Sequence, residues 1–297
     1  AEGFGQTRAT MKIGVLAVLI NIPLNYMLIF GKFGLPELGG VGCGWASSIS
    51  FWLMLICGTY YLHRSRHFAD LMIWQGRITP KLGTFRQHLS IGLPIALSLL
   101  IETSMFCIIA LLLAKYGAEV LSANQITLSI TSFAFMLPLS LCLALTIRIG
   151  HLNGAKRPTQ ARRVAILGML FSLILAGFNF SAMLYLASPL AAFFSDNEDV
   201  ISLAVQLLSF AALYQFSDSI QLACTGALRG YKDTKIPLLI AFFAYWLIGL
   251  PSGYFLAEIQ LLGPVGYWLG ILIGLSLGAV FLLIRFNKIS KHAQLEN

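Results

Sequence analysis

Charged residues are scarce in this chain of 297 residues. Asp, Glu, Lys and Arg together make up 11% of it, whereas hydrophobic residues make up 58%. A soluble globular domain carries about 25% charged residues, so a surface that faces mainly water is excluded. The apolar residues also occur in long runs without charge, which a soluble core does not need. The composition therefore indicates a protein that lies largely in lipid.

Several motifs of common enzymes and binding sites are missing from the sequence. It contains no phosphate-binding GxxxxGK[ST] loop, no HExxH and no GxSxG, which argues against ATP hydrolysis and against these hydrolase chemistries. The five cysteines form no CxxC pair and lie in or beside apolar runs, so we interpret them as small buried hydrophobic residues. His63 and His67 are four residues apart without an evident third ligand, which makes a zinc site improbable. We expect neither enzyme activity nor a bound cofactor.

Eight segments are long and apolar enough to cross a bilayer as helices. A hydrocarbon core of about 30 Å needs about 20 apolar residues in a helix. Continuously apolar runs, rather than alternating ones, favour helices over a barrel. The predicted fold class is therefore an all-α polytopic membrane protein with eight transmembrane helices. The predicted spans are residues 13–31, 39–62, 89–114, 121–147, 164–187, 200–227, 236–257 and 264–284.

Basic residues alternate between the connections of these spans. Eighteen of the 20 Lys and Arg lie before the first span, in every second connection or in the tail, and only Lys32 and Lys115 lie elsewhere. The positive-inside rule then places both ends of the chain in the cytoplasm. This topology signal accounts for the net charge of +8. We therefore expect membrane lipid as a partner and no nucleic acid.

Two helix pairs resemble each other and indicate an internal repeat. NIPLNY at residues 21–26 and GLPSGY at residues 249–254 are each followed by a short outward connection and by Val-Gly at the next span. Chance similarity is the alternative, but the shared Pro, Tyr and Val-Gly make it less favoured. Transporters commonly contain two repeats, and two repeats of six helices would require four helices before Ala1.

The domain organisation that we predict follows from this repeat. Residues 1–62 would be the last two helices of an N-terminal six-helix bundle, and residues 63–90 a cytoplasmic linker. Residues 91–297 would form a complete C-terminal six-helix bundle with a cytoplasmic tail. The chain begins at Ala1 without a signal-peptide pattern, and we interpret this start as a truncation rather than as a processed secreted protein.

Two acids inside the predicted spans are the strongest functional signal. Only Glu102 and Asp218, among twelve acidic residues, lie within spans. A charge at the bilayer centre costs at least about 2.5–3.5 kcal/mol, and no Lys or Arg lies inside a span to neutralise either acid. A carboxyl group in low dielectric can exchange H⁺ near neutral pH or bind Na⁺ through its oxygens. Packing beside a water-filled cavity is the alternative role for these two acids.

Other polar residues recur at helical spacing and are expected to face a common cavity. Helix–helix hydrogen bonding is the alternative for the Ser and Gln positions. A packing kink is the alternative for the two Asn around Pro23. Aromatic faces such as Phe106, Phe133, Phe135 and Tyr214 could attract an organic cation that competes with the coupling ion. The polar positions are Tyr214, Gln221 and Thr225 with Asp218, then Gln125, Ser129 and Ser132, Ser98 one turn before Glu102, and Asn21 and Asn25.

The sequence resembles the multidrug and toxic compound extrusion (MATE) family, in its NorM-like bacterial branch. The matching stretches are NIPLNY at 21–26, ELGGVG at 37–42, GLP at 92–94 with Glu102, RIG at 148–150, YQFSD at 214–218 and LRGYKD at 228–233. This resemblance implies a monomeric twelve-helix fold of two six-helix bundles around a central cavity, in the bacterial inner membrane. It also implies multidrug efflux, and hence antibiotic resistance, by antiport of hydrophobic organic cations such as drugs and dyes against inward Na⁺ or H⁺.

The resemblance also implies roles for individual residues. Family acids of the cation-coupling site match Glu102 and Asp218, which would be the metal ligands if Na⁺ is the coupling ion, with Tyr214 beside them. Paired amides on the family's fifth helix match Asn21 and Asn25. Family contacts to bound drugs match Phe106, Gln125 and Ser129. The family's first four helices, with an acid on the first, are absent from this sequence.

Three alternative functions were compared with antiport. A lipid-linked oligosaccharide flippase of a related fold would need a basic cavity for pyrophosphate, and no span holds Lys or Arg. An intramembrane prenyltransferase would need paired DxxxD-type acids on cytoplasmic loops, which are missing. A truncated remnant that does not transport remains the third alternative.

Overall fold

The computed structural model describes residues 7–34, 36–65 and 82–295. Within these residues, eight helices are long and apolar enough to cross a membrane, which confirms the predicted fold class. Each helix extends beyond its predicted span at one end or both. Sixteen residues of the predicted linker, 66–81, lie outside the described residues, and residues 82–90 are already helical. The spans are α1 (Thr7–Phe30), α2 (Gly39–Arg64), α4 (Leu82–Leu113), α5 (Ala118–Gly154), α6 (Pro158–Phe194), α7 (Glu198–Gly230), the composite helix α8–η3–α9–η4 (Lys235–Ile259) and α10 (Pro264–Leu295).

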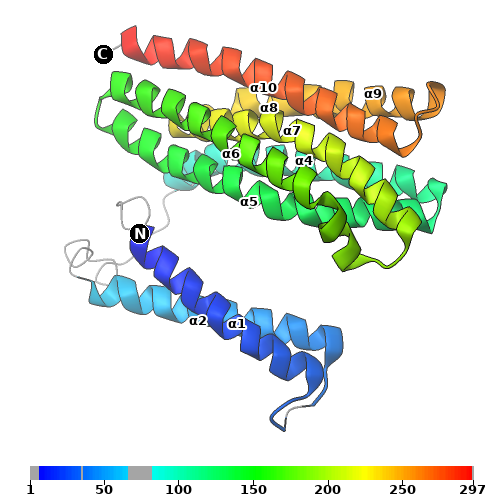
Figure 1. Cartoon of the computed structure of the whole chain (residues 1–297). Coiled ribbons are helices and arrows are strands. Elements are labelled where there is room, and N and C mark those ends of the chain that lie inside the picture. The colour runs from blue at the N-terminus through cyan, green and yellow to red at the C-terminus, as the bar shows by residue number, and fades with distance from the viewer. Residues whose placement is uncertain (1–6, 35, 66–81, 296–297) are drawn as a thin grey trace. The chain divides into compact units, whose positions relative to one another are not determined.

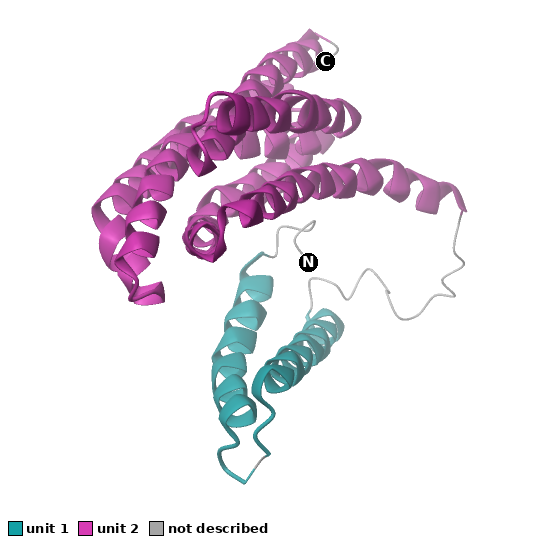
Figure 2. Cartoon of the chain, turned by 90° about the vertical axis from the view of Figure 1, so that its right-hand side faces the viewer, with its two compact units in different colours: residues 1–80 teal, residues 81–297 magenta. Residues whose placement is uncertain are grey.

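The chain divides into two units, residues 1–80 and 81–297 (Figure 2). In the first unit, α1 and α2 form a hairpin that closes tightly at Gly42. A Cβ atom at Gly42 would lie 2.4 Å from the main-chain oxygen of Leu28, so only glycine permits this approach. Small residues at such contacts let helices pack closely in lipid, where apolar burial gives little drive for association.

In the second unit, α7 lies at the centre and packs against α5, α6 and α10 (Figure 1). It is among the most buried of the eight helices, whereas apolar residues such as Phe133 and Tyr185 are more than four-fifths exposed on other helices. Exposed apolar side chains are typical of a lipid-facing surface. The cysteines only partly follow the expected burial, since Cys142 and Cys224 are buried but Cys43 and Cys107 are exposed.

Helix α10 packs through glycines against the composite helix before it. A Cβ atom at Gly266 would lie 2.4 Å from the main-chain nitrogen of Ala257, and one at Gly270 would lie 2.4 Å from the Cα of Gly253. The glycine spacing of four residues places these positions on one face. The composite helix itself contains two α-helical stretches, α8 (Lys235–Phe242) and α9 (Leu250–Tyr254), each followed by a π-helical one, η3 (Phe243–Gly249) and η4 (Phe255–Ile259). Both lie on the segment that contacts the α10 glycines.

Within residues 82–295, one ion pair lies at each end of the second unit. At one end, Glu258 pairs with Lys115 and its Oε1 accepts hydrogen bonds of 2.8 Å from the hydroxyls of Tyr116 and Tyr267. At the other end, Arg285 donates to Asp233 at 2.7 Å. Lys115 is one of the two basic residues that depart from the charge alternation in the sequence. The structure shows that an acid neutralises it locally.

Candidate functional site

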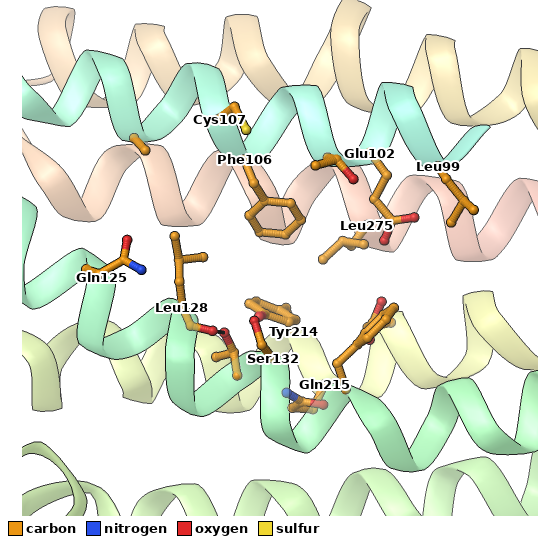
Figure 3. Close-up of a pocket in the computed structure, with 15 residues that line it drawn as sticks. Leu99, Glu102, Phe106, Cys107, Gln125, Leu128, Ser132, Tyr214, Gln215 and Leu275 are labelled. Carbon is orange, nitrogen blue, oxygen red and sulfur yellow. Dashed lines mark hydrogen bonds between the residues drawn. The ribbon is translucent and has the colours of Figure 1, made fainter. Parts of the chain in front are cut away.

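A cavity of about 460 Å³ opens between α4, α5, α7 and α10 in the second unit (Figure 3). Its wall combines apolar and aromatic side chains with polar ones, and binding sites for small organic molecules also combine the two kinds. The residues with polar side chains in the wall are Glu102, Thr103, Gln125, Thr131, Ser132, Tyr214, Gln215 and Asp218.

The two acids of the predicted coupling site both line this cavity. Glu102 lies eleven residues before the end of α4, and Asp218 lies twelve residues before the end of α7. Each acid is therefore about 16–18 Å from a helix terminus, since a helix rises about 1.5 Å per residue. Asp218 is 3% exposed, and its Oδ2 has no hydrogen-bond partner among the described residues. Buried oxygens of this kind bind water or a cation.

Tyr214 lies one turn before Asp218 on α7 and also lines the cavity. Its ring stacks on Trp268 of α10, with centroids 6.2 Å apart and an interplanar angle of 15°. The ring is 6% exposed, so the packing holds it in one orientation. A fixed aromatic face beside a carboxylate suits the binding of an organic cation.

The three predicted substrate contacts are not all brought together. Phe106 and Gln125 line the cavity, but Ser129 does not. The hydroxyl of Ser129 donates to the main-chain oxygen of Gln125 at 2.8 Å, and the residue is exposed. Viewed down the axis of α5, the residues that line the cavity lie within an arc bounded by Gln125 and Thr131, since each residue of a helix turns about 100°. Ser129 lies about 40° outside this arc, beyond Gln125.

Sequence reasoning missed Thr103, Thr131 and Gln215, which also line the cavity. Gln215 is 1% exposed and accepts a hydrogen bond of 3.4 Å from Asn179. Its spacing of three residues from Asp218 was a usable signal, because residues three apart share a helix face. Thr131 lies outside the helical spacing that predicted Ser132, and no pattern in the sequence pointed to it.

Asn21 and Asn25 lie on α1 in the first unit, whereas the residues that line the cavity belong to the second unit. Asn25 donates to Asn21 Oδ1 at 2.7 Å, and Asn21 donates to Ser50 Oγ of α2 at 3.1 Å. The two amides thus form a hydrogen-bonded chain that Ser50 continues, and Ser50 was not singled out from the sequence. The bond from Asn21 to Ser50 is a helix–helix contact, whereas the bond from Asn25 to Asn21 lies within α1.

No group of three or more His, Cys, Asp or Glu suited to a metal occurs among residues 7–34, 36–65 and 82–295. A cation in the cavity would instead be held by the two carboxylates with neutral oxygens such as those of Tyr214 and Gln215. Oxygen ligands of this type suit a weakly bound, exchangeable alkali cation.

Comparisons with known proteins agree on one family. The MatE family model matches residues 94–255, which is more than half of the chain. The chain is 41% identical over 285 residues to the multidrug resistance protein MdtK of Proteus mirabilis, and 42% identical over 290 residues to a probable multidrug resistance protein NorM of Oceanobacillus iheyensis. It covers 62% of the first relative and 65% of the second, so it spans less than two thirds of either.

Solved structures show the same fold. The eukaryotic MATE transporter AtDTX14 matches with a TM-score of 0.82 at 24% identity, over 96% of this chain and 64% of that one. A mutant of the Vibrio cholerae MATE transporter VcmN matches with a TM-score of 0.85 at 19% identity, over 97% and 63%. At these identities the comparison speaks only for the fold.

Proposed function

Because this chain belongs to the MatE family, we propose that the protein containing it is a secondary active antiporter that exports organic cations. The family is one of transporters, so the chain is not an enzyme. The coupling ion in this proposal is Na⁺ or H⁺ moving inward. The observation that carries the proposal is that Glu102 and Asp218 line a single cavity together with neutral polar and apolar side chains.

The chemistry of antiport follows from competition for these two carboxylates. Ionised carboxylates in a low-dielectric site are costly unless a cation neutralises them. Na⁺ or H⁺ can do so, and so can a bulky organic cation whose apolar part contacts Phe106, Leu128 and Tyr214. Since the same charges serve both, binding of one cation displaces the other. Each bound cation lets the cavity switch its opening to the opposite face of the membrane.

The lining of the cavity also bears on the flippase alternative. Among the described residues that form the 460 Å³ cavity, none is Lys or Arg. A site for a pyrophosphate group would need basic side chains to neutralise its oxygens. The acidic lining therefore favours a cationic substrate.

Dye transport in membrane vesicles tests the proposed function. Everted vesicles containing the complete transporter expose its cytoplasmic face to the bath, so export is measured as ethidium uptake. In one assay, Na⁺ is more concentrated in the lumen than in the bath at fixed pH, and in the other H⁺ is more concentrated in the lumen without Na⁺. We expect one of these gradients to drive uptake, and that gradient identifies the coupling ion. If neither gradient moves the dye above the level of vesicles lacking the protein, antiport of organic cations is rejected.

Topology in the bacterial cytoplasmic membrane is the second part of this proposal. Residues 1–62 would be the last two helices of an N-terminal bundle and 91–297 the C-terminal bundle of a monomeric transporter, with both chain ends cytoplasmic. Lys235 and Gln260, both exposed, lie at opposite ends of the composite helix Lys235–Ile259.

Cysteine labelling checks this orientation. In a background without other cysteines, an impermeant maleimide applied to intact cells is expected to label Gln260→Cys and not Lys235→Cys, because the basic end faces the cytoplasm. Permeabilised cells should label both variants, which controls for reactivity. Labelling of Lys235→Cys in intact cells would contradict the orientation.

A further inference from the structure

A second, smaller cavity adjoins the first at Glu102. Its volume is about 40 Å³, and Leu99 and Glu102 belong to the walls of both cavities. The polar side chains that line it besides Glu102 are Ser98, Gln221, Thr225, Arg229 and Tyr245. A polar cavity needs about 10–15 Å³ for a water, so this one has room for water or a small cation.

The polar atoms around the second cavity are not all paired within the protein. Gln221 donates to the hydroxyl of Tyr245, which fixes the amide, but Gln221 Oε1 has no hydrogen-bond partner in the described part of the chain. The side chain is 6% exposed. A Cβ atom at Gly278 would lie 2.7 Å from this oxygen, so the glycine of α10 leaves the room that the oxygen occupies. A buried oxygen without a protein partner is a place where water or a cation is bound.

The second cavity extends from Glu102 toward the basic end of the unit. Ser98 precedes Glu102 by one turn on α4, and Thr225 and Arg229 follow Asp218 toward the end of α7 at Gly230. Pro237, at the start of α8, also lines it. The helix ends that meet here carry the basic residues that face the cytoplasm under the positive-inside rule.

Arg229 lines this cavity and is half-buried at the last turn of α7. The two ion pairs among the described residues are Lys115–Glu258 and Arg285–Asp233, and Arg229 belongs to neither. Its guanidinium therefore faces the same small polar space as Glu102 without being committed to another acid. A positive charge in this position attracts the carboxylate of Glu102 and so competes with a cation that is bound there.

We propose that the second cavity is the passage by which the coupling ion leaves Glu102 for the cytoplasm, and that Arg229 is the positioning charge that drives this release. This inference rests on the proposed antiport. Gln221 Oε1 and the hydroxyls of Ser98 and Thr225 solvate the departing ion, since oxygen ligands replace part of its water shell. Arg229 then raises the concentration at which a cytoplasmic ion can bind again at Glu102.

The test measures inhibition by the coupling ion from the cytoplasmic side. In everted vesicles containing the complete transporter, ethidium uptake is followed while Na⁺, or H⁺ in a separate arm without Na⁺, is added to the bath. In Arg229→Gln, we expect the inhibiting concentration to fall about tenfold, because one charge is removed from a partly buried passage. Arg229→Lys keeps the charge, and Lys288→Gln removes an exposed charge at the same end. In both variants, we expect the inhibiting concentration to equal that of the wild type.

Three outcomes of this assay overturn the proposed role of the second cavity. The first is an unchanged inhibiting concentration in Arg229→Gln. The others are an inhibiting concentration that falls as far in Lys288→Gln, or as far in Arg229→Lys, as it does in Arg229→Gln. If Arg229→Gln does not fold, the isosteric Thr225→Val provides a second measurement: we expect ethidium uptake at a saturating gradient to slow by about threefold or more, and an unchanged rate overturns the passage. Absence of gradient-driven uptake in the wild type would instead reject the proposed antiport itself.

Discussion

Gradient-driven dye export is expected to fall roughly 100-fold in the complete transporter when Asp218 is changed to Asn or Glu102 to Gln. Each substitution keeps the size of the side chain and removes one of the two charges that line the cavity. Loss of one partner from a buried charge interaction costs about 2–5 kcal/mol, and about 1.4 kcal/mol corresponds to a factor of ten. The measurement is ethidium uptake into everted vesicles at equal amounts of folded protein.

Matched controls for these acids exist in the same unit. Glu119→Gln and Asp199→Asn make the same chemical changes at exposed positions outside the cavity, so both should export dye at close to the wild-type rate. Wild-type export by either cavity variant would remove that acid from the mechanism. A loss of export that the exposed variants share would assign the effect to overall charge instead.

The second large effect is expected on stability, at the contact between α10 and α9. A Cβ atom at Gly270 would lie 2.4 Å from the Cα and 2.6 Å from the nitrogen of Gly253, and backbone atoms cannot move aside as a flexible side chain can. We expect Gly270→Ala to destabilise the protein by about 1–3 kcal/mol, which is typical of overpacking, and Gly270→Leu to leave little folded protein. Heating detergent-solubilised transporter and measuring the monodisperse fraction by size-exclusion chromatography gives the melting temperature.

Gly177 on α6 provides the control for this prediction. A Cβ atom there would meet nothing within 4 Å. Gly177→Ala should therefore melt at or slightly above the wild-type temperature, because alanine is favoured over glycine in a helix by about 1 kcal/mol. Equal melting temperatures for Gly270→Ala and Gly177→Ala would show that the two helices separate without cost.

The arrangement of the cavity explains how far sequence reasoning reached in the site. Glu102 and Asp218 stood out because a charge in an apolar run needs a reason, and both line the cavity. Spacing also placed Tyr214 and Gln125 correctly on its wall. Ser129 and Ser132 were expected there too, but α5 is rotated so that Ser132 and Thr131 lie on the wall and Ser129 does not. A helical spacing of four residues defines a face, and it does not say where the edge of that face lies.

Arg229 illustrates a second kind of residue that a pattern misassigns. In the sequence it belongs to a cytoplasmic connection and contributes only to the charge bias. In the structure α7 continues to Gly230, so Arg229 reaches a cavity that Glu102 also lines, although the two are 127 residues apart in the chain. Only the tertiary structure, in which α4 contacts α8 and α7 lines the same cavity, creates this proximity.

The sequence by itself determined the eight helices, their all-α class and the two acids that lipid would not tolerate without a function. Those properties depend on the thickness of the bilayer and on the cost of a charge within it, and both act on each segment separately. The tertiary structure alone decided that Glu258 neutralises Lys115, that Ser129 lies outside the cavity and that Arg229 lies beside Glu102. These outcomes depend on how the helices rotate and approach one another, which is set by contacts between segments far apart in the sequence.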